Sequence, residues 1–139
     1  MIINQISVFI ENKEGRLAEL LEILAGNNID IRALSIADTA DFGILRLIVN
    51  DPERAMNALE KEGVTVSKTQ VIGVKLNDAP GALAHVLNVL SRHHISVEYT
   101  YAFITHSKNE ACVILRVEDN DKAINILNQN GIELLRHIN

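Results

Sequence analysis

Two short turns of the chain hold residue types that suit the binding of a small zwitterion. Each turn places a side-chain amide or carboxylate, at Asn12 or Asp78, three residues before a glycine, at Gly15 or Gly81. Glycine lets the backbone approach a ligand closely, and the start of a helix offers unpaired N–H groups that attract a carboxylate. A side-chain oxygen nearby can hold an ammonium group. The pattern indicates a site for a free α-amino acid in the segments Glu11-Asn12-Lys13-Glu14-Gly15-Arg16-Leu17 and Asn77-Asp78-Ala79-Pro80-Gly81-Ala82-Leu83.

The same residues have a purely structural interpretation. Asn12 or Asp78 can cap the helix that follows, and Pro80-Gly81 can simply turn the chain. Two copies of the turn do not decide between the alternatives, because a repeat in the chain explains the recurrence. The sequence therefore leaves two functions open, a ligand site and a structural or protein-interaction module without a small-molecule ligand.

No other residues form a pattern that supports catalysis or metal binding. The sequence has no His-Glu-x-x-His motif, and the adjacent His93 and His94 diverge by about 100° on a helix. Cys112 has no basic neighbour in sequence that would favour a reactive thiolate, so a buried apolar role is expected. A pair of Asp78 and His85 would lack a nucleophile. We therefore predict a protein that is not an enzyme and has no metal or cofactor; its five histidines are His85, His93, His94, His106 and His137.

The composition limits the partners of the chain. It has 139 residues, with 18 Asp and Glu against 13 Lys and Arg and a net charge of −5. An acidic chain does not suit direct binding to phosphate backbones, so nucleic acid is not an expected partner. No apolar run reaches the roughly 18 residues of a membrane helix, and the N-terminus lacks a basic region followed by an apolar stretch. With a single cysteine as well, the protein is expected in the cytoplasm, away from membranes.

An internal repeat organises the chain. The segment that begins at Gly15 recurs at Gly81, 66 residues later, and Ile29-Asp30-Ile31 recurs as Ile95-Ser96-Val97 at the same offset. Further along, the offset grows to 68 residues, because two extra residues fall in the polar segment 106–109. The repeat predicts two tandem modules, residues 1–68 and 69–139. No Gly, Ser or Pro linker separates them, so they are expected to pack side by side.

Each module repeats the same order of hydrophobic patterns. Apolar residues at i, i+3, i+4 and i+7 predict helices around 17–24 and 83–90, and Asp51 with Pro52, or Asp119, can cap a second helix in each module. Alternating or β-rich segments predict strands at 5–10, 29–37, 43–49 and 64–66, and again at 72–76, 95–104, 111–117 and 132–135. The order β-α-β-β-α-β occurs twice. It predicts an α+β fold of two tandem ferredoxin-like modules, each an antiparallel sheet with helices on one face.

The other face of each predicted sheet is partly apolar. Ile44 and Ile48 in the first module, and Cys112 and Ile114 in the second, alternate with the residues expected under the helices. An exposed apolar face usually marks a surface for a partner. We therefore expect a homodimer or a larger assembly that covers it.

The second turn carries a resemblance to a known family. The run from Asn77 to Ala84, followed by Leu87 and Leu90 and by His94-Ile95-Ser96-Val97-Glu98, resembles the ACT domain of the regulatory regions of aspartokinase and phosphoglycerate dehydrogenase. The first module resembles it less closely, because Glu14 stands where the family has proline. The resemblance covers essentially the whole chain as two copies.

The resemblance implies a function as well as a fold. ACT domains are ferredoxin-like modules that pair side by side and bind small effectors, usually amino acids, at the interface between modules. By this resemblance the chain is a non-catalytic sensor of a free amino acid that regulates a partner, with Asp30 and Ser96 as polar positions near the second strand. The implied ligand-binding residues are Asn12, Gly15, Arg16, Leu17, Asp30, Asn77, Asp78, Pro80, Gly81, Ala82, Leu83 and Ser96.

Three aromatic residues distinguish the second module from the first. Tyr99, Tyr101 and Phe103 occupy alternate positions, where the first module has small residues. The rings either pack in the core or a dimer interface, or they line an effector pocket, in which case Tyr99 and Tyr101 contact the apolar side chain of the effector. Asp38 is distant in sequence from both turns and is expected to take no part in binding.

Overall fold

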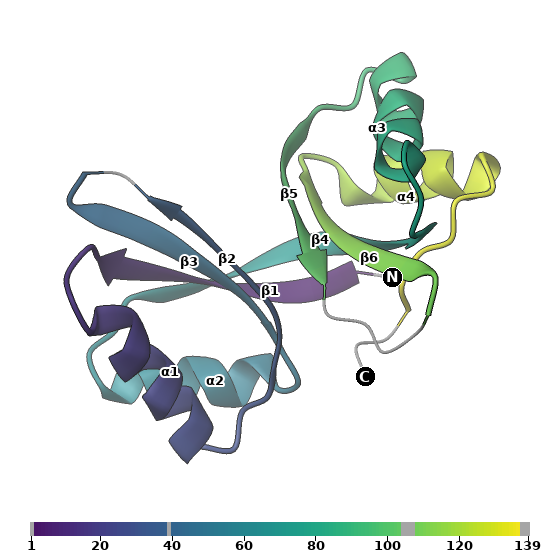
Figure 1. The fold of residues 1–139 in the computed structure, drawn as a ribbon. Coiled ribbons are helices and arrows are strands. Elements are labelled where there is room, and N and C mark those ends of the chain that lie inside the picture. Colours follow the sequence, from purple (N-terminus) through teal and green to yellow (C-terminus); the bar gives the residue numbers. More distant parts are fainter. Residues whose placement is uncertain (1, 39, 104–107, 137–139) are drawn as a thin grey trace. The chain divides into compact units, whose positions relative to one another are not determined.

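A computed structural model describes residues 2–38, 40–103 and 108–136. The elements follow one another in the predicted order, with both modules visible as a repeat of strands and helices (Figure 1). The predicted α+β fold of two ferredoxin-like modules is confirmed. The elements are β1 (Ile2–Glu11), α1 (Arg16–Gly26), β2 (Ile31–Asp38), β3 (Phe42–Val49), α2 (Pro52–Lys61), β4 (Val66–Asn77), α3 (Ala82–Arg92), β5 (Val97–Phe103), β6 (Glu110–Val117) and α4 (Asn120–Gln129).

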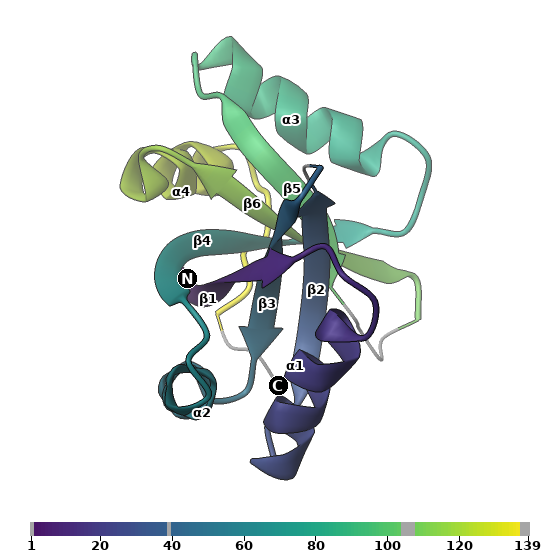
Figure 2. The ribbon, with the colours of Figure 1, turned by 90° about the vertical axis from the view of Figure 1, so that its left-hand side faces the viewer.

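The chain divides into two compact units. The first unit is Asn4–Thr69, and the second runs from Gln70 onward and includes Ile2 and Ile3. Strands in the first unit are ordered β2-β3-β1-β4, and the hairpin of β2 and β3 is visible in Figure 2. Strands in the second unit are ordered β4-β6-β5. Strand β4 contains all of the strand expected at 72–76 but only Val66 of the strand expected at 64–66, so the first module has no separate closing strand among the described residues.

Each unit has its own hydrophobic core between one sheet face and two helices. In both units, alternate strand residues contact the apolar stripes of the helices, because side chains repeat every two residues on a strand face and about every 3.6 residues on a helix face. Burial of each large aliphatic side chain contributes about 1.5–3 kcal/mol. The first core includes Ile6, Val8, Leu20, Leu24, Leu45, Leu47 and Leu59, and the second includes Ile72, Val74, Val86, Leu90, Val113, Leu115 and Leu127.

The second helix of each unit begins at the predicted cap. The Asp51 carboxylate accepts a hydrogen bond from the N–H of Arg54 at 3.1 Å, and Pro52 occupies the first helical position. The Asp119 carboxylate accepts from the N–H of Lys122, also at 3.1 Å. Both caps confirm the sequence-based prediction, and each stabilises its helix by about 1 kcal/mol.

The apolar sheet face that we expected to be bare is largely covered in the second unit, so the expectation is wrong there. In the first unit, Phe9 and Phe42 stay exposed on this face. Ile48, Cys112 and Ile114 are buried, with exposed fractions of 0%, 5% and 0%. In the second unit, Ile114 lies opposite Gly73, and a Cβ atom at Gly73 would meet the side chains of Ile3 and Leu135. Segments from near the two ends of the chain therefore cover this face, an arrangement that local periodicity does not indicate.

The final predicted strand is only an isolated bridge. Leu134 pairs with Val74, while the N–H of Lys75 donates to the carbonyl of Glu133 at 2.9 Å. The segment 132–135 pairs with β4 over too few residues to form a strand. The predicted strand end at Ile104, and the histidines His106 and His137, lie outside the described residues.

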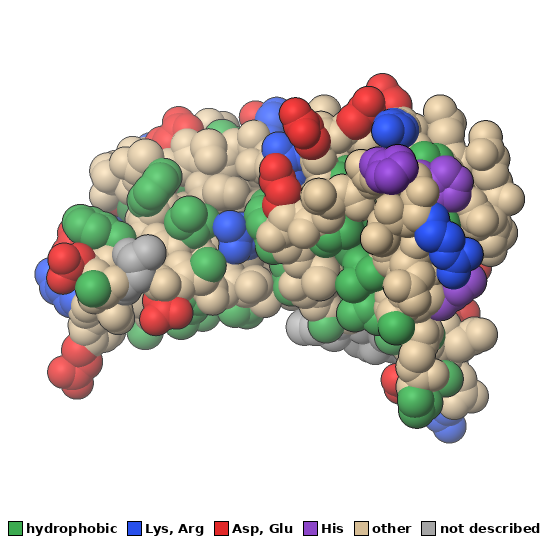
Figure 3. Space-filling view, turned by 90° about the horizontal axis from the view of Figure 1, so that it is seen from above, with side chains coloured by type: hydrophobic (Ala, Val, Ile, Leu, Met, Phe, Trp, Pro, Cys, Tyr) green, Lys and Arg blue, Asp and Glu red, His purple; other side chains and the backbone are tan. Residues whose placement is uncertain are grey.

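The surface carries both signs of charge. On the face drawn in Figure 3, Lys and Arg side chains lie among acidic ones, in keeping with the net charge of −5. Within the described part of the chain, no helix is long and apolar enough to cross a membrane.

Candidate functional site

Helices α1 and α3 start in the same unusual way. Gly15 and Gly81 precede them with φ angles of +81° and +86°, in the left-handed region that glycine adopts without strain. Neither helix start has a side-chain cap. The first helical bonds are those from the N–H groups of Glu19 and His85 to the carbonyls of Gly15 and Gly81, each at 3.0 Å. The N–H groups of the intervening second and third helical residues therefore have no acceptor within the helix.

This observation decides one alternative left by the sequence. Asn12 and Asp78 do not cap the helices that follow them, so the capping interpretation is wrong for these residues. Their backbone N–H groups instead donate to the carbonyls of Asp41 and Asn109, at 2.9 and 2.8 Å. These equivalent bonds tie each turn to the neighbouring hairpin, while both side chains stay exposed.

The first turn opens onto a hollow of about 170 Å³, which we call the first-turn hollow. It brings together Asn12 and Leu17 of the implied set with residues from β2 and β3. Asp38 also lines it, although Asp38 is distant in sequence from both turns. Its lining residues are Ile10, Glu11, Asn12, Lys13, Leu17, Ile36, Asp38 and Gly43.

Strand register explains why Asp38 lies here. Gly43 of β3 pairs with Ile10 of β1 on one side and with Asp38 of β2 on the other. Neighbouring strands lie about 5 Å apart, so three residues distant in sequence form one row across the sheet. The sequence held no signal for this row, because pairing register is a long-range property.

The second turn borders a hollow of about 350 Å³, the second-turn hollow. Asn77 and Ala82 of the implied set line it, together with charged residues from β4, β6 and the segment after α4. Lys75 Nζ lies 3.4 Å from Glu133 Oε1, and both side chains are partly exposed. His85 and Glu110 also line this hollow, so both signs of charge meet there.

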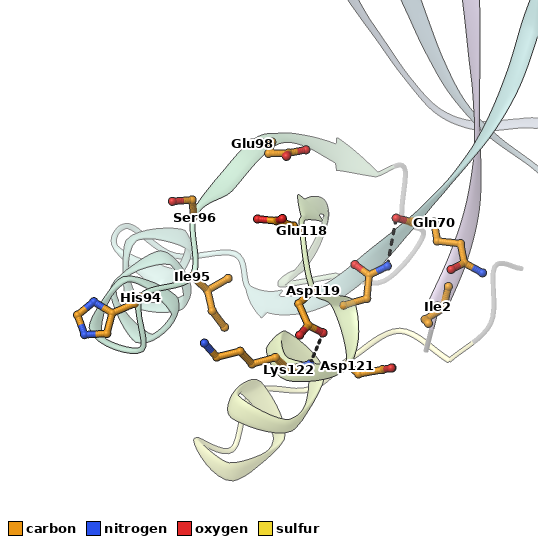
Figure 4. Close-up of a pocket in the computed structure, with 11 residues that line it drawn as sticks. Ile2, Gln70, His94, Ile95, Ser96, Glu98, Glu118, Asp119, Asp121 and Lys122 are labelled. Atoms are coloured by element: carbon orange, nitrogen blue, oxygen red, sulfur yellow. Dashed lines mark hydrogen bonds between the residues drawn. The ribbon is translucent and has the colours of Figure 1, made fainter.

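Within each unit, the polar position near the second strand does not line the hollow at that unit's turn. Ser96 lies in a separate hollow of about 740 Å³ with Glu98, Glu118 and Asp121 (Figure 4). Asp30 forms an ion pair with Arg32 at 3.3 Å, and its N–H donates to Asn50 Oδ1 at 2.9 Å. The remaining implied residues, Gly15, Arg16, Asp78, Pro80, Gly81 and Leu83, belong to the turns and helix starts themselves.

The aromatic side chains lie on the sheet face away from α3 and α4. Tyr101 pairs with Ile114 and Phe103 with Cys112, whereas the alternate residues of β6 contact the helices. The rings of Tyr99 and Tyr101 are stacked, with centroids 6.4 Å apart and planes inclined by 20°. This position favours packing over contact with a ligand at the second turn, because neither ring lines the second-turn hollow.

The one cysteine of the chain, Cys112, is buried in surroundings that do not favour a reactive thiolate. Burial raises the pKa of the Cys112 thiol; Lys75 acts in the opposite direction, and Glu110 and Glu133 raise the pKa further. The thiol is therefore neutral at physiological pH and is a poor nucleophile. Among the residues that the structure describes, no group of His, Cys, Asp and Glu side chains is arranged to hold a metal ion.

The fold and the paired glycine turns define a double ferredoxin-like protein with two equivalent open helix starts. The family model of the ACT domain pair matches residues 1–139, and the chain belongs to this family. A comparison with curated protein sequences finds no match.

Solved structures show the same fold. The crystal structure of protein BT0572 from Bacteroides thetaiotaomicron has 45% identity and a TM-score of 0.91, covering 97% of this chain and 92% of that one. The regulatory subunit of aspartate kinase from Thermus thermophilus has 16% identity and a TM-score of 0.66, covering 91% of each chain. Aspartokinase III of E. coli, in complex with aspartate and ADP, has 21% identity and a TM-score of 0.57, covering 93% of this chain and 32% of that one. The last two likenesses concern the fold alone.

Proposed function

We propose that this ACT domain pair protein is a non-catalytic cytoplasmic sensor that binds a free amino acid at its strand-to-helix turns and regulates a partner protein. One observation carries the proposal. Helices α2 and α4 are capped by aspartates, whereas α1 and α3 begin at left-handed glycines without any side-chain cap. The chain thus has suitable capping residues near all four helices but leaves the first helix of each copy without a side-chain cap.

A free amino acid matches the groups at each turn. Its carboxylate accepts hydrogen bonds from the open N–H groups of the helix start, where the helix dipole also favours negative charge. Its ammonium group is held by the exposed oxygens of Asp78 or Asn77 at the second turn, or of Asn12 at the first. Arg16 Nη1 lies 3.0 Å from Glu19 Oε2, and this ion pair holds part of the Arg16 guanidinium beside the first turn. The bound zwitterion supplies the cap that the sequence omits.

A melting assay with the standard amino acids tests this function. At about 100 times the dissociation constant, a ligand stabilises the folded state by roughly 2.7 kcal/mol, which raises the Tm of a chain of this size by several degrees. N-acetylated and amidated analogues of the best ligand should bind much more weakly, because each lacks one charge. If no amino acid at millimolar concentration shifts the Tm, the interaction module without a ligand replaces this proposal.

Two variants examine the second turn. Asp78→Ala should weaken binding there by about 1.5–3 kcal/mol if its carboxylate holds the ammonium group. Glu60→Ala removes an exposed carboxylate from α2, remote in sequence from both turns, and serves as the matched control. Asp38→Ala is unsuitable as a control because Asp38 lines the first-turn hollow. Equal ligand affinity of Asp78→Ala and wild type would remove Asp78 from the proposed site.

We also propose that the protein acts as a homodimer. Phe9 and Phe42 are 56% and 55% exposed, on the face of the first unit's sheet away from α1 and α2. A second copy that covers these rings would remove this apolar surface from water. Light scattering at tens of micromolar should report a dimer for the wild type and a smaller species for Phe9→Glu. A monomeric wild type would end this part of the proposal.

A further inference from the structure

The first-turn hollow has aliphatic walls. Ile10 is 6% exposed, Leu17 is partly buried, and Ile36 keeps 42% of its surface exposed although it lies on the helix-facing side of β2. An isoleucine that is open to solvent beside two other aliphatic side chains presents apolar surface to whatever enters the hollow.

Gly43 keeps the hollow open. A Cβ atom at this position would lie 3.5 Å from Ile10 Cγ2 and 3.6 Å from Ile36 Cγ2, within the space between the two walls. The second module has alanine at both corresponding positions, Ala111 for Gly43 and Ala102 for Ile36. The combination of an isoleucine at position 36 with a glycine at position 43 therefore distinguishes the first unit from the second.

The size of the hollow limits its occupant. Its volume is about 170 Å³, and an apolar cavity of about 150 Å³ is large enough to hold benzene. A branched side chain of three or four carbons fills such a space, whereas the methyl group of alanine leaves most of it empty. A polar side chain would lose its hydrogen bonds to water against the aliphatic walls.

Charged groups at the rim match the two ends of an amino acid. Lys13 supplies an ammonium group whose present partner is Glu11, with Nζ 3.9 Å from Oε2, and Asp38 supplies a carboxylate from the end of β2. The N–H of Leu17 has no acceptor within α1, because the first helical bond is that of Glu19. The carboxylate of a ligand can thus contact Lys13 and Leu17, while its ammonium group contacts Asp38 in addition to Asn12.

We infer that the first-turn hollow selects branched aliphatic amino acids, of the class of valine, leucine and isoleucine. This inference rests on the proposed function and specifies its ligand class. Selection comes from apolar contact with Ile10, Leu17 and Ile36, and recognition of the free amino acid comes from the charged rim.

Isothermal titration calorimetry with individual amino acids tests the ligand class. Each buried methylene contributes about 0.8 kcal/mol, a factor of about four in affinity, so leucine should bind roughly sixtyfold more tightly than alanine. Binding of charged or small polar amino acids in preference to all three aliphatic ones would overturn the inference and leave the proposed function standing. Binding of no amino acid would overturn both.

A pair of variants locates the binding in this hollow. Ile36→Ala should weaken leucine binding about tenfold, because the ligand loses one aliphatic wall. Leu34→Ala is the matched control, since Leu34 lies two residues away on the same face of β2, is 44% exposed, and does not line the hollow. The affinity of the Leu34→Ala protein for leucine should stay within about twofold of that of the wild type. Equal affinities of Ile36→Ala and Leu34→Ala would overturn the inference.

A third variant fills the hollow instead of removing a wall. Gly43→Ala should reduce affinity for leucine more than affinity for alanine, because its methyl group occupies space needed by the larger side chain. The new Cβ would also lie 3.2 Å from the carbonyl oxygen of Ala37, so a melting curve should accompany the titration. A folded Gly43→Ala protein with an unchanged ratio of leucine to alanine affinity would count against the inference.

Discussion

The contact at Gly73 offers a direct test of how the second unit covers its apolar sheet face. Replacing Gly73 with alanine would place a Cβ atom 2.7 Å from Leu135 Cδ1 and 2.8 Å from Ile3 Cδ1. Carbon atoms in contact prefer separations of about 3.5–4.0 Å, so both methyl groups must move by close to 1 Å. Both side chains are buried, at 7% and 4% exposure, and have little room to rotate.

The expected magnitude follows from two opposing effects. Overpacking a buried site by one methyl group costs about 1–3 kcal/mol. Replacing glycine also lowers the conformational entropy of the unfolded chain. This stabilises the folded state by about 0.4–1 kcal/mol where alanine can adopt the backbone conformation. Gly73→Ala should therefore lower the free energy of unfolding by about 1–2 kcal/mol and the Tm by about 4–8 °C.

Urea denaturation followed by circular dichroism measures this change. Gly26→Ala is the control, because Gly26 lies in α1 and a Cβ atom added there would meet nothing within 4 Å, so it should stabilise the protein slightly. The double variant Gly73→Ala with Leu135→Ala removes one of the two close methyl groups. The double variant should lose less free energy of unfolding than the sum of the losses in the two single variants, by about 0.5–2 kcal/mol.

Strict additivity of the two substitutions would refute this reasoning, because it would mean that Gly73 and Leu135 are not in contact. A Gly73→Ala protein as stable as Gly26→Ala would refute it as well. Either result would restore the sheet face of the second unit as an open surface.

Two further predictions concern helix capping and the cysteine. Asp51→Ala and Asp119→Ala should each lower the free energy of unfolding by about 1 kcal/mol in urea melts, since each removes the acceptor for a backbone N–H group at a helix start. Because burial raises the pKa of Cys112 in the folded state, iodoacetamide should modify it slowly in native protein at about pH 8 and rapidly in urea. The unfolded thiol ionises first, so the free energy of unfolding should fall as the pH rises above about 8.5.

Each of these has a simple control. Asp119→Asn keeps a side-chain oxygen at the cap and should retain most of the stability that Asp119→Ala loses. Cys112→Ala should remove the part of the alkaline loss that the thiol causes. An unchanged urea midpoint for both cap variants, or fast alkylation of the native thiol, would contradict the respective argument.

The sequence alone determined the helices, most of the strands and the location of the turns. Periodicity gave the strands and helices, because a helix or strand that packs on one face must repeat its apolar residues at a fixed spacing. The caps at Asp51 and Asp119 could also be predicted, because a cap depends only on residues within one turn of the helix start. Gly15 and Gly81 were identified from their place between a strand pattern and a helix pattern.

Only the tertiary structure decided which distant residues join those turns and which apolar faces are covered. Asp38, Ile36 and Gly43 reach the first turn through the register of three neighbouring strands. Ile3 and Leu135 reach Gly73 from near opposite ends of the chain. Both arrangements depend on contacts between segments far apart in sequence, whose free energy is set by packing across the fold, so no local pattern of residue types records them.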